Sequence, residues 1–514
     1  MSSERIQVAR LRLGRERWAV ALAASLAAGM VLYVGLRGLG AAWWLGAAIA
    51  AGLGVVGCRS LARRLPSDLD GLARTKRAWC IAWLVVAILA LVQTARMSAF
   101  MIDPATQQAQ SLFPSDSWYI GHSCLTAYAE AARLATEGAP NIYVGELYLD
   151  RKIDGFNVDA YHYPPSFLLL PLALRAIAGS VYTNERMCWF AISALALLLA
   201  LGAAAAALDP PSRRRAIAAA PAIWISVPVQ LGFQMSNVQL LVIAITGLAW
   251  VAFRRWRPLG AALLALAAVA KIFPGVLVLD LLLRRRWRDA ATTAGFGLAF
   301  CGASYAIVGA APFRAFFRFE LPHLSTGEAF ARPFSRAFAV GQNMSPFGIA
   351  LKLEKLGVPG ATLAAGRVLG TIFGLALIAL AVWASRRTAD RPPTRENATN
   401  EIAVWLALLS LGTLASPFAP ANYVLASLVW LVAIDRNDFS PAFAAIVGLA
   451  TSAPFLLPRE GNFLLRSLAF LPAQIFAVGV PAYVLWRAGR RRERSNELVL
   501  ASEAQPRRER VQTG

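Results

Sequence analysis

Acids, histidines and tyrosines gather in one polar stretch, residues 97–163, between very apolar segments. Asp103 and Asp116 stand out, because a carboxylate at the edge of a cleft can act as general base towards an acceptor hydroxyl. Both aspartates also fit an ordinary role as helix caps, since Ile102-Asp103-Pro104 and Ser115-Asp116-Ser117 are typical capping sequences. The residue types alone leave the two roles open.

The same stretch contains His122 and ends in the motif Tyr161-His162-Tyr163-Pro164-Pro165. Aromatic side chains at a membrane interface usually anchor a helix. They can equally stack on a sugar or on an isoprenoid chain. We therefore treat His122, Tyr161, His162 and Tyr163 as candidate substrate-binding residues.

Lys271 is the single cation inside a long apolar run, Pro258–Leu283. A lysine in such a setting is costly unless it is paired, reaches the interface or serves a ligand. A lone ammonium at membrane depth suits a phosphate oxygen, whereas the alternative is simple snorkelling to the interface.

Two turns rich in amides are further candidates. Gln234 and Asn237 lie in one, and Gln342 and Asn343 lie in the other. Amides in a membrane protein either join helices or bind hydroxyl groups. Shortly before the second turn, Arg332 and Arg336 are candidates for binding an anionic phosphate.

The elements that must position these residues are apolar helices. Hydrophobic residues make up 57% of the 514-residue chain, and their runs are continuous instead of alternating. This pattern predicts an all-α polytopic membrane protein with about 14 transmembrane helices and exterior juxtamembrane helices, and it disfavours a β-barrel.

The charge pattern predicts orientation. The 51 Lys and Arg against 29 Asp and Glu give a net charge of +22, which in a soluble protein would indicate nucleic acid. Here the arginines fall in short loops beside apolar runs, so they predict topology and contacts with anionic membrane lipids, and no nucleic-acid partner. Both termini are expected in the cytoplasm and residues 97–163 on the exterior face.

The run 258–283 has arginine clusters on both sides, so both of its ends are expected at the cytoplasmic face. Two short helices that turn near Lys271 and Pro274 satisfy this, because proline breaks a helix. Such broken spans are tolerated where they line a cavity or lie within protein.

The chain is expected to divide into six segments. These are N-terminal transmembrane segments (1–96), a large periplasmic loop with juxtamembrane helices (97–186), a transmembrane core with the hairpin 258–283 (187–310), a second periplasmic segment (311–362), C-terminal transmembrane helices (363–488) and a disordered basic cytoplasmic tail (489–514).

The five cysteines form no CxxC pair, and Cys124 in the polar stretch has no obvious partner. We predict neither a disulfide framework nor a zinc site, and no metal ligands. No nucleotide-binding fingerprint occurs in a usable context, and the predicted cytoplasmic loops are short. An activated group would therefore have to arrive as a lipid.

Together these motifs resemble glycosyltransferase family 87. The resemblance lies in an acid after an early span, Tyr-His-Tyr-Pro-Pro, the amide turn 234–239 and Lys271-Ile272-Phe273-Pro274 followed by a basic cluster. It runs from about Asp116 to Arg288 and more loosely to Tyr423. In this chain His122 or Ser123 stands at the spacing where the family carries its acid.

The resemblance implies a GT-C fold and a polyprenyl-phosphate-mannose-dependent α-mannosyltransferase of the bacterial inner membrane. It implies Asp116 as general base, with Asp103 second. From the residues themselves we expect Lys271, with Arg332 or Arg336, at the donor phosphate. A hexose, expected to be mannose, would pass with inversion from a polyprenyl-phosphate donor to a glycan or lipid acceptor on the periplasmic face. No cofactor is required, although a divalent cation remains open.

The alternative class is transport, by a lipid-linked saccharide flippase or a solute transporter. A transporter is expected to carry charged residues deep in several spans and a path open to both faces. The polar residues here cluster on one predicted face, which favours an enzyme.

Overall fold

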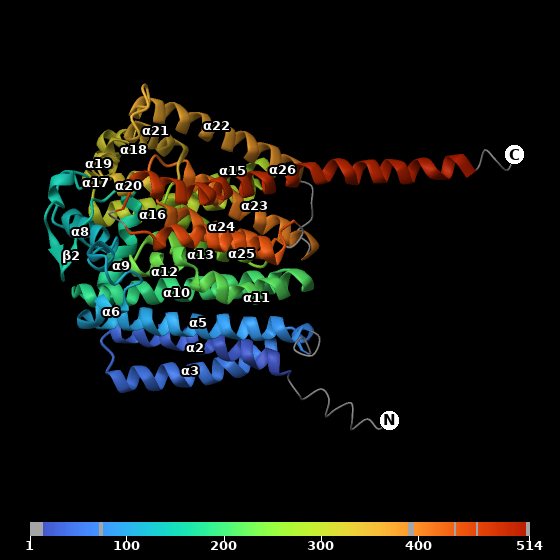
Figure 1. Ribbon diagram of the computed structural model, residues 1–514, viewed down its shortest axis with the longest axis horizontal. Coiled ribbons are helices and arrows are strands. Elements are labelled where there is room, and N and C mark those ends of the chain that lie inside the picture. The colour runs from blue at the N-terminus through green and yellow to red at the C-terminus, as the bar shows by residue number, and fades with distance from the viewer. Residues whose placement is uncertain (1–13, 71–75, 389–394, 436–437, 459–460, 510–514) are drawn as a thin grey trace.

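The computed structural model describes residues 14–70, 76–388, 395–435, 438–458 and 461–509. Within them the chain is a bundle of helices lying side by side (Figure 1). The start of α2 and the end of α26 lie on one side of the bundle, and short elements such as α8 and α9 lie on the other. The prediction of an all-α membrane protein is confirmed.

Seven helices in the described residues are long and apolar enough to cross a membrane. They are α2 (Arg15–Gly38), α3 (Trp43–Arg64), α5 (Arg77–Ile102), α10 (Tyr182–Ala207), α16 (Trp287–Val308), α22 (Leu363–Thr388) and the apolar part of α26 (Phe463–Glu509). An eighth span is formed if α11 (Pro210–Ile225) and α12 (Val227–Gln234) count as one helix, bent by 52°.

The predicted count of about 14 transmembrane helices is not supported. Other apolar helices are shorter: α9 (Leu169–Ala178), α13 (Val238–Phe253), α14 (Arg257–Ala270), α24 (Ala421–Ile434) and α25 (Pro441–Ser452). Fourteen residues, as in α14 and α24, extend about 21 Å, which is less than the roughly 30 Å hydrocarbon core. Apolar runs in the sequence therefore overstate the number of complete crossings.

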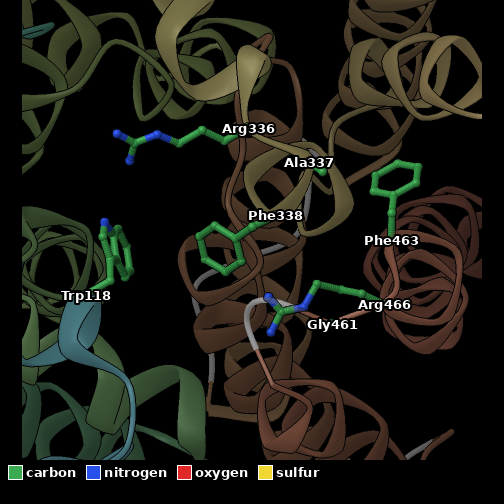
Figure 2. A pocket seen from close by; sticks show the side chains of 7 residues that line it. All are labelled: Trp118, Arg336, Ala337, Phe338, Gly461, Phe463 and Arg466. Carbon is green, nitrogen blue, oxygen red and sulfur yellow. The ribbon is translucent and has the colours of Figure 1, made fainter.

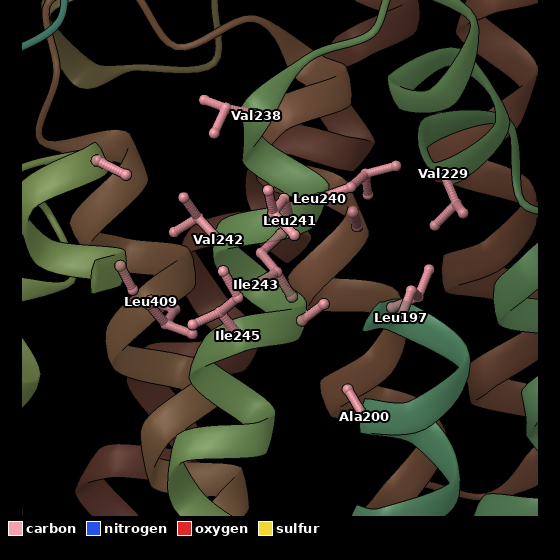
Figure 3. Close-up of a cluster of buried hydrophobic side chains, with 14 of the residues drawn as sticks. Leu197, Ala200, Val229, Val238, Leu240, Leu241, Val242, Ile243, Ile245 and Leu409 are labelled. Atoms are coloured by element: carbon pink, nitrogen blue, oxygen red, sulfur yellow. The ribbon is translucent and has the colours of Figure 1, made fainter. Parts of the chain in front are cut away.

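The short helix α13 is buried by its neighbours. Figure 3 shows Leu240, Leu241 and Ile243 of α13 among Leu197 of α10 and Leu409 of α23 (Arg395–Leu414). Protein covers α13 on nearly every side, because 14 of its 16 residues are buried. A helix surrounded by protein does not have to match the thickness of the lipid.

Polar contacts join the helix ends on the side of the bundle where α2 begins and α26 ends. Arg254 after α13 donates to Glu401 of α23 at 2.6 Å. Arg487 of α26 pairs with Asp435 after α24 at 2.6 Å. We call this side the basic end, because helices begin or finish here in arginine clusters.

The opposite side, the loop end, carries two polar segments. The first holds α6 (Gln107–Gln110), α7 (Ser117–Ile120), α8 (Leu125–Thr136), β1 (Lys152–Ile153), β2 (Phe156–Asn157) and η4 (Pro165–Leu168). The second holds α17 (Ala311–Ala315), η5 (Phe316–Glu320), α18 (Leu321–Thr326), η6 (Glu328–Phe330), α19 (Ala331–Ser335), α20 (Ala337–Gly341) and α21 (Pro346–Lys355).

The two strands of the first segment form an antiparallel hairpin that pairs Ile153 with Phe156. Its two-residue turn is Asp154-Gly155, and both residues have positive φ, +48° and +84°. Asp-Gly is a favoured sequence for this turn because it tolerates positive φ at both positions.

The apolar run 258–283 is broken into α14 and α15 (Gly275–Leu283) at Lys271–Pro274. Asp280 of α15 is fully buried and accepts from three groups: Arg284 Nε at 2.8 Å, Ser385 Oγ at 2.6 Å and Trp405 Nε1 at 3.1 Å. Ser385 belongs to α22 and Trp405 to α23. One carboxylate thus fixes α15 against two other helices.

The C-terminal part of the chain differs from the expectation of a disordered tail. Helix α26 continues through residues 489–509 to Glu509. This stretch is rich in arginine, glutamate, alanine and leucine, which favour helix. Residues 1–13 and 510–514, both predicted to be cytoplasmic, lie outside the described residues.

We expect Asp280→Ala to lower the thermal stability of the purified chain markedly. The change leaves the Arg284 guanidinium and the Trp405 N–H buried without their acceptor, a loss of about 3–5 kcal/mol for a broken buried ion pair. The measurement is thermal unfolding in detergent, followed by the exposure of buried cysteines to a fluorogenic thiol reagent. Glu146→Ala, at an exposed acid of the loop end, is the control and should melt like the unaltered chain.

Candidate active site

Lys271 lies where α14 ends, at the break between two apolar helices. Its Nζ donates to Gln239 Oε1 at 2.9 Å and lies over two aromatic rings, 4.6 Å from the centroid of Tyr423 and 5.4 Å from that of Tyr163. Among the described residues no carboxylate forms an ion pair with it. The ammonium is held by an amide and two π faces, and its charge is not neutralised.

Asn237, in the turn before α13, positions two of the groups around Lys271. Asn237 caps α13 by accepting from the Gln239 N–H at 2.8 Å, which fixes both side chains relative to each other. Asn237 Nδ2 donates to the Tyr423 hydroxyl at 2.7 Å. The backbone of Ser236 has a positive φ of +50°, which makes this turn tight.

Tyr163 connects this turn to the first polar segment. Its hydroxyl lies 3.0 Å from that of Tyr128 in α8, and the Tyr163 carbonyl accepts from the Tyr143 hydroxyl at 3.0 Å. Burial raises the pKa of Tyr163 well above its ordinary value. The phenol therefore stays neutral and acts as a hydrogen-bonding group facing Lys271.

His122, Cys124 and Asp159 form a second cluster beside the first. His122 Nε2 lies 3.3 Å from Asp159 Oδ2 and 3.7 Å from Cys124 Sγ. Asn237 Nδ2 donates to Cys124 Sγ at 3.1 Å, and the Tyr423 hydroxyl lies 3.7 Å from the same sulfur. Asn237 and Tyr423 thus contact both clusters.

Backbone contacts hold the second cluster in place. The Cys124 N–H donates to the Met235 carbonyl at 2.8 Å, immediately before the turn that carries Asn237. His122 forms a parallel bridge with Asn157 at the end of β2, and the Asp159 N–H donates to Thr126 Oγ1 at 3.3 Å. The β-hairpin thereby brings Asp159 back to the start of α8.

A cavity of about 490 Å³ opens beside Trp118 at the loop end (Figure 2). Its lining is aromatic and cationic: Trp118, Arg336, Ala337, Phe338, Gly461, Phe463 and Arg466. Lys271 does not line this cavity. The Trp118 ring connects the cavity to the cluster of His122, Cys124 and Asp159, because it also stacks on His122 with ring centroids 4.1 Å apart.

Both predicted catalytic aspartates act as helix caps in the structure. Asp116 Oδ1 accepts from the Trp118 N–H at 3.0 Å, and Asp103 Oδ1 accepts from the Ala105 N–H at 2.9 Å. Lys271 makes its contacts with Gln239 and the tyrosine rings, and with neither aspartate in the described residues. Asp116 nevertheless begins the short helix whose Trp118 lines the cavity, so its catalytic role stays a prediction.

Of the aromatic motif, Tyr163 is the residue that reaches Lys271. The Tyr161 hydroxyl donates to the Pro164 carbonyl at 3.0 Å. His162 Nδ1 lies 2.8 Å from Glu320 Oε1 and so joins the two polar segments. These contacts shape the loop end.

Several predicted substrate-binding amides are engaged within the protein. Gln234 accepts from the Leu112 N–H at 2.8 Å and donates to the Tyr119 carbonyl at 3.0 Å. Asn343 donates to the Pro417 carbonyl at 2.9 Å and accepts from the Ala419 N–H at 3.0 Å. They fasten loops to helices, which is the other role that the sequence left open.

The remaining candidates differ in position. Gln342 is buried beside Asn343. Arg336 lines the cavity, whereas Arg332 is exposed and is not part of the lining. The second cation of the cavity is Arg466, a residue that the sequence did not single out.

Sequence reasoning did not place Tyr423, Cys124 and Asp159 in the site. Tyr423 lies far along the chain, and no local signal marks it. The spacing His122-x-Cys124 and the position of Asp159 just before the aromatic motif are the signals that were available.

These features define a helical membrane protein with a cationic, aromatic site at one end of its bundle. Comparison with family models identifies the class further, because the model of glycosyltransferase family 87 matches residues 161–417. That range is half of the chain and contains Tyr163, Gln239 and Lys271. The protein belongs to glycosyltransferase family 87, as the sequence motifs indicated, and is a membrane glycosyltransferase. No curated protein matches the chain.

Lys352 of α21, at the loop end, is expected to make the stability of the protein depend on pH. Its Nζ donates to Gln474 Oε1 of α26 at 3.3 Å, and burial lowers the pKa of Lys352 to about 8. Between that value and about 10.5, the unfolded chain binds more protons here than the folded chain, so stability should rise with pH. Below pH 8 both states are protonated, and the cost of burying the charge is constant.

We therefore expect Lys352→Met to raise the melting temperature at pH 7 and to flatten its rise between pH 8 and pH 10. The charge-burial penalty removed is on the order of 3 kcal/mol. Thermal unfolding in detergent across this pH range is the measurement. Lys355→Met, at an exposed lysine of the same helix, is the matched control, and parallel pH profiles for all three proteins would contradict the assignment.

Proposed function

We propose that this glycosyltransferase transfers a hexose, expected to be mannose, from a polyprenyl-phosphate donor to a glycan or lipid acceptor. The observation that carries the proposal is the position of Lys271, a partly buried ammonium at a helix break with no ion pair to a carboxylate among the described residues. Burying a charge in apolar surroundings is costly unless a counter-charge arrives. The phosphate of a lipid donor supplies that counter-charge.

The surroundings of Lys271 suit such a donor. The Tyr163 and Tyr423 rings offer apolar faces for a sugar or for the first isoprenoid units, while Gln239 and Asn237 offer hydrogen bonds to hydroxyl groups. Residues 271–274 interrupt the apolar helices α14 and α15, and such a break in a membrane protein is tolerated where it is buried in protein or lines a cavity. A donor can reach this break from the lipid without crossing a soluble domain.

The cavity beside Trp118 is proposed as the approach for the acceptor and for part of the donor. Arg336 and Arg466 line it and provide positive charge for an anionic group. Trp118 and Phe338 lie edge to face with ring centroids 5.5 Å apart, and such aromatic surfaces bind sugar rings.

The proposed reaction is a displacement at the anomeric carbon. Asp116, with Asp103 as second candidate, takes the proton of the acceptor hydroxyl while its oxygen forms the new bond to that carbon. The bond between the anomeric carbon and the phosphate oxygen breaks at the same time. The polyprenyl phosphate leaves with the electron pair, and Lys271 stabilises its negative charge.

The proposed location is the exterior, periplasmic face of the bacterial inner membrane. Arginine-rich helix ends gather at the basic end of the bundle, and such residues favour the cytoplasm. The candidate site lies at the loop end, away from those clusters.

Lys271→Met should lower kcat/KM for a lipid-linked donor by about 100-fold or more, as expected for the loss of a charge that stabilises a leaving group. The assay uses the purified chain in nanodiscs with labelled polyprenyl-phosphate mannose and a membrane-lipid extract. Lys152→Met, at an exposed lysine of the loop end, is the control. Unchanged use of the donor by the Met variant would reject the phosphate role.

Asp116→Asn separates capping from catalysis, because asparagine caps a helix about as well as aspartate does. We expect kcat to fall by about 100-fold or more, the usual contribution of general base catalysis, with the melting temperature unchanged. Asp103→Asn tests the second candidate, and Asp150→Asn, at a loop-end position of positive φ, is the control. Full activity in the Asp116 variant would remove it from the role. Movement of the lipid-linked sugar across proteoliposomes without transfer would favour the transport alternative.

A further inference from the structure

Two groups of different chemistry approach one ring nitrogen, His122 Nε2. Asp159 Oδ2 lies at 3.3 Å and Cys124 Sγ at 3.7 Å from it. A ring nitrogen offers either one N–H or one lone pair, so it cannot make separate, well-formed hydrogen bonds to both. The 3.3 Å separation is also long for a charge-assisted bond, which is usually about 2.7–2.9 Å.

Two of the three separations between these ligand atoms fit a shared zinc ion. Zinc binds nitrogen and carboxylate oxygen at about 2.0–2.2 Å and thiolate sulfur at about 2.3 Å, in a tetrahedron. Those bond lengths place nitrogen and oxygen about 3.4 Å apart, and nitrogen and sulfur about 3.6 Å apart. The observed values are 3.3 Å and 3.7 Å, and all three ligand atoms lie within 4.8 Å of one another.

The groups around the cluster also suit a metal thiolate. Asn237 Nδ2 donates to Cys124 Sγ at 3.1 Å, and the Tyr423 hydroxyl is within 3.7 Å of it. Donors of this kind stabilise a ligated sulfur. Trp118 stacks on the His122 ring and holds its orientation, and Figure 2 shows the Trp118 side chain facing the cavity.

We propose that His122, Cys124 and Asp159 bind a zinc ion whose fourth position is open to an oxygen ligand. Sulfur and imidazole nitrogen favour zinc over magnesium or manganese. Three protein ligands with one open position are the arrangement of catalytic zinc sites, where the ion polarises a bound oxygen. The Asp159 side chain is 38% exposed, so the site opens towards solvent on that side.

The charges of the cluster balance. A thiolate and a carboxylate together neutralise a divalent cation. Tyr423 connects the cluster to Lys271, because its ring lies 4.6 Å from the ammonium and its hydroxyl 3.7 Å from Cys124 Sγ. The zinc therefore adds a polarising centre beside the ammonium without adding net charge. This role in sugar transfer rests on the proposed function, whereas zinc binding does not. This proposal replaces the expectation, drawn from the sequence, that the chain has no metal ligands.

Zinc content and cobalt spectroscopy test the site without any turnover. The purified full-length chain should contain about one zinc per molecule by elemental analysis. After removal of the metal with a chelator, added Co²⁺ should give the thiolate-to-cobalt charge-transfer band and the strong visible bands of a tetrahedral site. Zinc should displace the cobalt and abolish both signals.

Cys124→Ser and Asp159→Asn should each lower zinc affinity by at least about 100-fold, because even changes to groups outside the ligand set cost 10–100-fold. Cys301→Ser and His323→Ala are matched controls, at a free cysteine and at a histidine remote in sequence from the cluster, and should leave the spectrum unchanged. Melting curves identify any variant that fails to fold, and the near-isosteric Asp159→Asn keeps the test valid if the cysteine variant does so.

The proposal is overturned if the chain carries no zinc and gives no cobalt thiolate band, or if both signals persist in the Cys124 variant. Its failure is distinguishable from that of the proposed function. A chain that binds zinc but does not transfer sugar from a lipid donor keeps the metal site and loses the function. A chain that transfers sugar but binds no metal keeps the function and loses the metal site.

Discussion

The ammonium of Lys271 imposes the main physical constraint on this protein. It lies among apolar helices, where an unbalanced charge is costly, and Gln239 with two tyrosine rings stabilises it only in part. The surrounding structure holds it in place. Asp280 fixes α15 against α22 and α23, and α13 supplies Gln239 from a turn set by Asn237.

The first polar segment is built around the same place. Gln234 fastens residues 112–119, the Cys124 N–H bonds to the Met235 carbonyl, and the β-hairpin returns Asp159 to His122. Four of the eight residues predicted to bind substrate make contacts that fold the loops onto the helix ends: Tyr161, His162, Gln234 and Asn343. The groups at the site itself are one ammonium, two phenol rings, two amides, and a histidine with a thiol and a carboxylate.

The family match and the site geometry rest on different parts of the chain. The family model covers the helices that carry Lys271, whereas His122, Cys124 and Asp159 precede its first matched residue. The proposed zinc site therefore rests on the side chains of this chain and not on the family match.

The sequence by itself determined the class of protein, the break at Lys271 and the family. Each depends on local information: continuous apolar runs, a proline beside a lone lysine, and motifs short enough to recognise. It overstated the number of full spans, because a run of apolar residues does not reveal whether lipid or other helices surround it, as α13 demonstrates. The tertiary structure alone decided which polar groups meet. Tyr423 and Arg466 join a site begun near residue 118, and Asp159 reaches His122 through a hairpin, because packing of helices distant in the chain sets those distances and no local pattern records it.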